Sequence, residues 1–175
     1  FEPNLNVVKT SLTPILAGAK FYNKSPESVK KISLFCANEI KKRRNLIELV
    51  KSLDVYSNGK MFFESRYRIA WCLFNHTDIV LSHQRDLALN YLYFDAAWLG
   101  FPVVHNAHMV KELGYYYEGF DAEAAADQLV YVAKNFDNEK AEYLKKSREY
   151  ISKFLPDHPR NVKGYEKLIA QVMKS

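Results

Sequence analysis

The chain has 175 residues, of which 48% are hydrophobic and 14% aromatic, and its formal net charge at pH 7 is +5. This composition excludes a disordered or low-complexity chain and indicates one packed domain, with room for an additional terminal helix. No apolar run approaches the roughly 20 residues that cross a bilayer, and no signal peptide opens the sequence, so we expect a cytoplasmic protein. The chain begins at Phe1 without an initiator Met, which suggests either a fragment of a longer protein or a processed chain.

The first half of the chain alternates helical patterns with short apolar runs. We predict a helix over residues 11–22, a buried strand over 32–37, an amphipathic helix over 39–53 and a helix over 66–74. Between the last two, Asn58-Gly59 separates the apolar runs 54–57 and 60–63. An Asn-Gly pair in this position is the strongest short-range signal for a β-hairpin, so we expect a small antiparallel excursion there.

The second half continues the alternation and then becomes helical. We predict strands over 78–82, 101–104 and 114–117, an apolar helix that ends at Leu99, and helices over 121–135, 138–155 and 161–174. Asp121 has the chemistry of an N-cap for the first of the three closing helices. Pro156 and Pro159 separate the last two.

Strands that alternate with helices are typical of a parallel sheet with helices on both faces. We therefore predict an α/β fold with a Rossmann-like domain over residues 1–155. A C-terminal helix over 156–175 either packs on this domain or reaches toward another domain on its N-terminal side.

Two pairs of polar residues follow neighbouring predicted strands. His83-Gln84 comes after the strand over 78–82, and His105-Asn106 after the strand over 101–104. In an open α/β sheet, ligands bind outside the carboxyl ends of the strands. We therefore expect both pairs at one edge of the sheet, where they either bind phosphate, sugar or base, or are ordinary satisfied polar groups.

The helix between these pairs is apolar almost throughout, with a stripe formed by Leu87, Tyr91, Phe94 and Trp98. Asp95 lies beside this stripe, and a carboxylate on a helix buried on most faces needs hydrogen-bond donors. Two ribose hydroxyls could supply them, and so could a nearby Arg or backbone amides. The helix begins either at Asp86 or at Asn90. If it begins at Asn90, this residue could cap it and leave its N–H groups facing a diphosphate, or could be a cap without a ligand.

The segment from Asp95 to Val104 reads DAAWLGFPVV and resembles the Glu-Ala-Met-Ala-x-Gly-x-Pro-Val-Val block of GT-B-fold glycosyltransferases. This resemblance implies the C-terminal, nucleotide-sugar-binding half of a GT-B fold, with Asp95 on the donor ribose. Several further motifs together resemble a group of bacterial GT-B-like proteins of unassigned substrate: Glu2-Pro3-Asn4, Ser82-His83-Gln84, Leu89-Asn90-Tyr91-Leu92-Tyr93, His105-Asn106 and Gly114-Tyr115-Tyr116-Tyr117.

One position departs from this family's pattern. Many retaining members carry a second acidic residue eight positions before the ribose-binding one, where this chain has Leu87. The stereochemistry of transfer therefore stays open. GT-B enzymes generally lack a catalytic metal and the chain has no Asp-x-Asp motif, so we expect no metal and no cofactor, the nucleotide-sugar being a substrate. The general base would belong to an N-terminal domain, and no catalytic residue is assigned.

Without a metal, helix N–H groups and a cation must stabilise the leaving diphosphate. Lys9 is the first candidate for that cation and Arg85 the second, although either could be an ordinary surface charge. The densest basic cluster, residues 41–44, indicates either a solvated helix face or a surface for phosphates, such as an anionic membrane at which lipid-linked acceptors reside.

Cys36 and Cys72 lie within apolar runs, which predicts buried free thiols in a reducing compartment. Neither belongs to a Cys/His spacing typical of zinc sites.

The sequence therefore predicts the donor-binding domain of a metal-independent glycosyltransferase, inactive by itself. Its expected partners are a nucleotide-sugar, the N-terminal domain of the same enzyme and an unidentified acceptor. The alternative is a non-enzymatic basic module that binds nucleic acid or protein. Its aromatic residues cluster in apolar segments instead of alternating with cations, so nucleic acid is not the expected partner.

Overall fold

The strands form two small parallel sheets. A computed structural model describes residues 11–37, 42–85 and 90–173. In it, β1 (Ile32–Leu34) pairs with β2 (Met61–Phe63). The second sheet has the order β3-β4-β5, formed by β3 (Val80–Leu81), β4 (Val103–His105) and β5 (Tyr115–Tyr116). All three pairings are parallel, which confirms the predicted α/β class with a parallel arrangement of strands.

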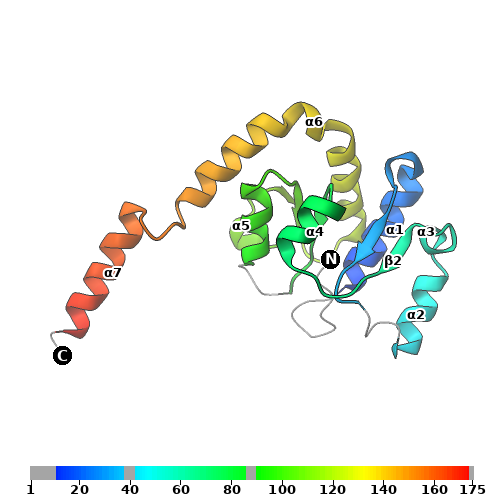
Figure 1. The fold of residues 1–175 in the computed structure, drawn as a ribbon, viewed down its shortest axis with the longest axis horizontal. Coiled ribbons are helices and arrows are strands. Elements are labelled where there is room, and N and C mark those ends of the chain that lie inside the picture. The colour runs from blue at the N-terminus through cyan, green and yellow to red at the C-terminus, as the bar shows by residue number, and fades with distance from the viewer. Residues whose placement is uncertain (1–10, 38–41, 86–89, 174–175) are drawn as a thin grey trace.

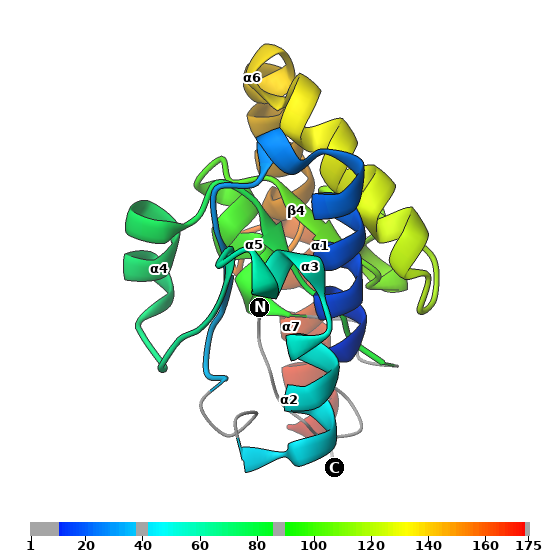
Figure 2. The ribbon, with the colours of Figure 1, turned by 90° about the vertical axis from the view of Figure 1, so that its right-hand side faces the viewer.

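Helices cover the strands from both sides. In chain order they are α1 (Leu12–Lys24), the 3-10 helix η1 (Pro26–Ser28), α2 (Arg44–Lys51), α3 (Asp54–Ser57), α4 (Ile69–His76), α5 (Tyr91–Trp98), the 3-10 helix η3 (His108–Val110), α6 (Ala122–Ser152) and α7 (Pro159–Val172). Figure 1 shows this order along the chain. In Figure 2, α1 and the first part of α6 lie on one side of the strands, and α4 and α5 lie on the other.

The buried apolar residues form two neighbouring clusters. One joins α1, β1, β2 and the start of α6, with Ile15 and Leu34 among its fully buried members. The other joins α5, β4 and the middle of α6, and centres on Tyr93 and Val103. The second cluster holds α5 against the sheet and so positions the residues that follow β3 and β4.

The predicted β-hairpin around Asn58-Gly59 is wrong. Residues 54–57 form the short helix α3, and β2 pairs in parallel with β1. Asn58 ends α3, and Gly59 takes the left-handed conformation with φ of 65°. The same dipeptide suits the end of a helix as well as a hairpin turn, because both require a residue with positive φ.

The closing helices differ from the prediction at one point. The Asp121 carboxylate accepts hydrogen bonds from the N–H groups of Glu123 and Ala124, both at 2.9 Å, which confirms the predicted N-cap. The expected break between residues 135 and 138 is absent, because α6 runs through it without interruption. No Gly or Pro stands there to interrupt the backbone hydrogen bonds.

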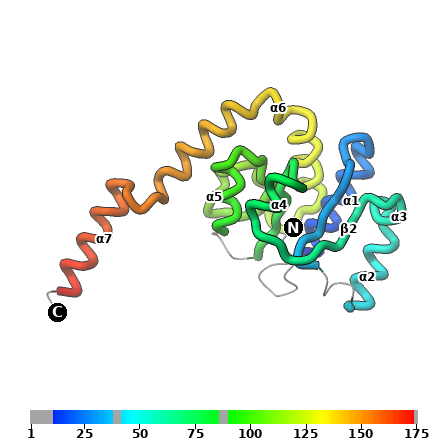
Figure 3. Tube along the Cα trace, in the orientation of Figure 1, coloured from blue at the N-terminus to red at the C-terminus, as the bar shows by residue number. Residues whose placement is uncertain are grey.

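Helix α7 buries no residue and extends away from the other elements, as Figure 3 shows. Its exposed side chains include Tyr165, Leu168 and Ile169. The structure thus places the C-terminal helix apart from the sheet, at the end of α6. None of the helices in the described ranges is both long and apolar enough to cross a membrane.

Candidate functional site

The candidate site lies at the edge of the sheet where β3 and β4 end. Asn106 connects the residues at this edge through hydrogen bonds. Its side-chain Oδ1 accepts from the backbone N–H of Gln84 at 2.8 Å, and its Nδ2 donates to the carbonyls of Gln84 at 2.7 Å and Gly119 at 2.9 Å. The residues after both strands therefore lie side by side, as parallel pairing requires. Both hydrogens of the Asn106 amide are used within the protein, so Asn106 positions the edge, and its contact with a sugar or base stays a prediction.

His105 is a structural residue. Its ring is 0% exposed, its Nδ1 accepts from the N–H of Ala107 at 3.1 Å, and its Nε2 donates to the carbonyl of Leu113. Burial lowers the pKa of His105 to about 4, so the ring is neutral at pH 7. With both ring nitrogens bonded to the backbone, His105 fits the alternative of a satisfied polar group, and its contact with a ligand stays a prediction.

His83, at the end of the neighbouring strand, has a different environment. Its Nδ1 lies 2.9 Å from the Tyr117 hydroxyl, which is also 3.3 Å from the carbonyl of Ser82. Its Nε2 is buried and has no partner among the described residues. Burial lowers the pKa of His83 to about 4, so it offers a neutral ring nitrogen whose donor or acceptor role depends on the tautomer.

Gln84 adds two more unpaired polar atoms to the same edge. The residue is only 3% exposed, yet within the described ranges neither its side-chain oxygen nor its nitrogen has a hydrogen-bond partner. A buried amide without partners costs about 1–3 kcal/mol for each unsatisfied group. Buried polar atoms without partners are uncommon in folded proteins, so these two atoms call for a partner beyond the described residues.

Helix α5 begins beside this edge. Asn90 caps it, with Oδ1 accepting from the N–H of Leu92 at 3.1 Å, so of the two helix starts that the sequence left open the structure has the one at Asn90. The Tyr93 hydroxyl donates to the Ser82 hydroxyl at 2.9 Å, and the Tyr93 ring lies 4.9 Å from the His105 ring. These contacts hold the first turn of α5, the positive end of its dipole, next to the ends of both strands.

The prediction that this helix is buried on most faces is wrong. Tyr91 is 78% exposed and Trp98 is exposed as well, whereas Tyr93, Ala96 and Ala97 are buried. An almost uniformly apolar helix carries little periodic signal, and the small Ala side chains make the face that approaches the sheet and α6.

Asp95 therefore lies in solvent instead of among apolar side chains. No ion pair of Asp95 with any described residue is present, so its carboxylate oxygens remain able to accept hydrogen bonds. The expectation of a costly buried carboxylate is corrected, and the ribose contact stays a prediction that rests on the motif.

The structure adds little about the cations that were predicted to bind phosphate. Lys9 lies outside the described residues, as does Lys41 of the basic cluster. Arg85 is exposed, and so are the remaining cluster residues 42–44 at the start of α2.

The prediction of two buried thiols is wrong, since Cys36 is exposed and Cys72 is half-buried.

Sequence reasoning missed one residue of the edge, Phe120, and gave Tyr117 only a place in the predicted strand over 114–117. Tyr117 positions His83 through its hydroxyl, and the Phe120 ring, 56% exposed, lies 4.6 Å from the His83 ring. Both follow β5, the third parallel strand. Applying the strand-end rule to this strand as well would have pointed to them.

Among residues 11–37, 42–85 and 90–173, no group of three or more His, Cys, Asp or Glu side chains is arranged to hold a metal ion. A comparison with curated proteins finds no significant match. The sequence matches a protein family over residues 1–169, nearly its whole length. The chain therefore belongs to the DUF2827 family, which is described as a protein of unknown function.

Proposed function

We propose that this chain is the donor-binding, C-terminal half of a GT-B-fold glycosyltransferase, which transfers a sugar from a nucleotide-sugar without a metal. The proposal extends the observed parallel α/β arrangement to a Rossmann-like sheet. The acceptor and the general base belong to the other half of such an enzyme. The isolated chain would then bind a nucleotide without catalysing transfer.

The observation that carries the proposal is the set of unpaired buried atoms where β3 ends. Nε2 of His83 and the side-chain amide of Gln84 are withdrawn from water without partners among the described residues. They offer both hydrogen-bond donors and acceptors to a polar ligand. The exposed ring of Phe120, beside His83, offers a flat apolar surface. A sugar nucleotide presents hydroxyls, phosphate oxygens and a planar base, which match these three kinds of contact.

The start of α5 supports a phosphate at the same edge. Backbone N–H groups and the positive end of a helix favour anions, and the Asn90 cap fixes where this end lies. Both edge histidines are neutral at pH 7, so neither supplies a positive charge to a diphosphate. We expect the helix end and a cation, Lys9 first, to supply that stabilisation.

Asp95 lies at the fifth position of α5, just over one turn beyond the Asn90 cap, and exposes its carboxylate. In the proposed complex this carboxylate accepts hydrogen bonds from both ribose hydroxyls. The exposed apolar side chains of α7 would contact the N-terminal domain, and the exposed cations 42–44 would face an anionic membrane surface.

The test is calorimetric titration of the chain with UDP, GDP, ADP and their sugars in EDTA. We expect one of these to bind in the micromolar to millimolar range, and Asp95→Ala to weaken it about tenfold, equivalent to ~1.4 kcal/mol. Asp157→Ala removes an exposed carboxylate between α6 and α7 and is the matched control, expected to bind as the unmodified chain does.

A thermodynamic cycle separates the ribose contact from a general charge effect. It combines the Asp95→Ala variant with a nucleotide that lacks the ribose hydroxyls. If Asp95 binds the ribose hydroxyls, a 2′,3′-dideoxynucleotide should bind equally well to the Asp95→Ala variant and to the unmodified chain. Absence of binding across the whole panel at millimolar ligand would refute the proposed function.

A further inference from the structure

The Tyr117 hydroxyl lies between two groups that compete for its proton. It is 2.9 Å from Nδ1 of His83 and 3.3 Å from the carbonyl oxygen of Ser82. Burial raises the pKa of Tyr117 and lowers the pKa of His83 to about 4, so at pH 7 the hydroxyl keeps its hydrogen and the neutral ring carries one. The positions of these two hydrogens decide what Nε2 of His83 can offer to a ligand.

Only one arrangement of the two hydrogens makes both contacts hydrogen bonds. The Ser82 carbonyl can only accept, so the Tyr117 hydroxyl must donate to it and accept from Nδ1 of His83. In the reverse arrangement the hydroxyl donates to Nδ1, and its oxygen faces the carbonyl oxygen with lone pairs on both sides. Ser82 and Tyr117 are 2% and 3% exposed, so little water reaches this carbonyl to replace the missing donor. The ring hydrogen of His83 therefore belongs on Nδ1.

Neighbouring contacts fix where the Tyr117 hydroxyl lies. The N–H of Tyr117 donates to the carbonyl of His105 at 2.9 Å, which anchors its backbone at the end of the sheet. The rings of Tyr117 and His83 are nearly parallel, with 21° between their planes. The side-chain hydroxyl of Ser82 is already held by the hydroxyl of Tyr93 at 2.9 Å. The arrangement of Tyr117, His83 and the Ser82 carbonyl is thus built into the fold.

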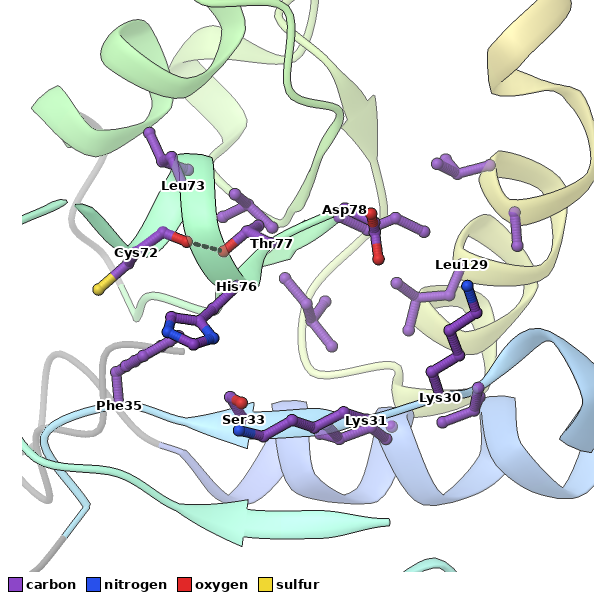
Figure 4. A pocket seen from close by; sticks show the side chains of 18 of the residues that line it. Lys30, Lys31, Ser33, Phe35, Cys72, Leu73, His76, Thr77, Asp78 and Leu129 are labelled. Atoms are coloured by element: carbon purple, nitrogen blue, oxygen red, sulfur yellow. Dashed lines mark hydrogen bonds between the residues drawn. The ribbon is translucent and has the colours of Figure 1, made fainter. Parts of the chain in front are cut away.

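The unpartnered Nε2 of His83 does not open into the large cavity of the molecule. This cavity, of about 1180 Å³, lies between β1 and β3, and Figure 4 shows it between Ser33 of β1 and Asp78, which precedes β3. Among the described residues that line the cavity, His83 is absent. The centre of the His83 ring instead lies 4.6 Å from the centre of the exposed Phe120 ring, at the edge where α5 begins.

We propose that Tyr117 holds His83 with its ring hydrogen on Nδ1, so that Nε2 accepts a hydrogen bond from a sugar hydroxyl or a base N–H of the ligand. The identity of this ligand rests on the proposed function, whereas the position of the hydrogen does not. A phosphate does not fit at Nε2, because its oxygens are acceptors and two facing lone pairs repel. The Gln84 amide does not set this preference, since it carries both a donor and an acceptor. Tyr117 is a positioning residue, and the diphosphate stays at the start of α5.

Nitrogen NMR of the chain with isotope-labelled histidines tests this inference without any nucleotide. Correlations between the ring nitrogens and ring hydrogens distinguish the nitrogen that carries a hydrogen from the one that does not, and the spectrum of His83→Phe assigns the signals of His83. At pH 7 we expect the hydrogen on Nδ1 in the unmodified chain. In Tyr117→Phe, which removes only the hydroxyl, Nδ1 loses its acceptor, and we expect the hydrogen on Nε2 in more than about half of the molecules. Tyr165→Phe removes an exposed hydroxyl in α7 and is the matched control, expected to leave the hydrogen on Nδ1.

Titration of the same labelled chain then tests the ligand. The nucleotide-sugar of the panel that binds should shift the Nε2 signal of His83, and Tyr117→Phe should weaken its binding about tenfold. Inorganic phosphate at the same concentration should leave the hydrogen on Nδ1.

Three results would overturn the inference: a hydrogen on Nε2 in the unmodified chain, an unchanged hydrogen position in Tyr117→Phe, or a phosphate that moves the hydrogen to Nε2. The first of these is read from the unmodified chain and does not depend on the folding of a variant. A hydrogen on Nδ1 without binding across the nucleotide panel would support the role of Tyr117 and count against the proposed function, so the two failures are distinguishable.

Discussion

A histidine lies at the end of β4 and another just beyond the end of β3, and their hydrogen-bond environments differ. His105 has both ring nitrogens bonded to the backbone and contacts no solvent, whereas His83 has one nitrogen bonded and one buried without a partner among the described residues. Burial lowers the pKa of both to about 4. Burial and a shifted pKa therefore do not distinguish a structural histidine from a candidate ligand-binding one, but the hydrogen-bond inventory does.

The largest expected effect is on stability, from His105→Ala. This change removes a wholly buried ring and leaves the carbonyl of Leu113 and the N–H of Ala107 unpaired, so we expect unfolding to become easier by about 3–5 kcal/mol. Urea denaturation measures it. His108→Ala, three residues away and exposed, should change the free energy of unfolding by less than about 0.5 kcal/mol. Similar values for the two variants would contradict the structural role of His105.

Asn106→Ala should have the next largest effect. It removes the hydrogen bonds of the Asn106 side chain with the backbone of Gln84 and with the carbonyl of Gly119, and we expect the free energy of unfolding to fall by about 2 kcal/mol. Asn135→Ala, which removes one exposed hydrogen bond within α6, is the matched control. If Asn106→Ala left stability unchanged but abolished nucleotide binding, Asn106 would belong with the ligand-binding groups after all.

His83→Phe should separate binding from stability. The ring shape is kept, an unpaired buried nitrogen is removed, and the Tyr117 hydroxyl can still donate to the carbonyl of Ser82. We expect nucleotide binding to weaken about tenfold, while the free energy of unfolding stays within about 1 kcal/mol of the original. Titration calorimetry and urea denaturation measure the two quantities. A loss of stability close to that of His105→Ala would show that His83 is also structural.

The smallest expected effect is on the pH dependence of stability. Both histidines have folded-state pKa values lowered to about 4, so between about pH 6.5 and 4 the unfolded chain binds protons that the folded chain does not. Stability should therefore fall as the pH is lowered through this window and be unaffected by these groups above it. His83→Phe should flatten the slope by less than about 1.4 kcal/mol per pH unit. An unchanged slope would mean that His83 is not shielded from water.

Several features of the edge could be predicted because they depend on short stretches of sequence. Asn90 and Asp121 are N-caps that follow from side-chain chemistry directly before a helix. The buried face of α5 could not be predicted, because Tyr91 and Trp98 are as apolar as the residues that pack inward. The role of Asn58-Gly59 was ambiguous for a similar reason, since two kinds of turn accept the same dipeptide.

The sequence by itself determined the parallel α/β class, the N-caps and the meeting of the polar residues after β3 and β4, because periodicity and strand direction are local properties. Only the tertiary structure decided which of these polar groups are satisfied internally. His105 reaches the carbonyl of Leu113 and Asn106 reaches that of Gly119, whereas Nε2 of His83 and the amide of Gln84 reach no described residue. Hydrogen-bond satisfaction depends on atoms that different parts of the chain bring together, and no pattern along the sequence records that arrangement.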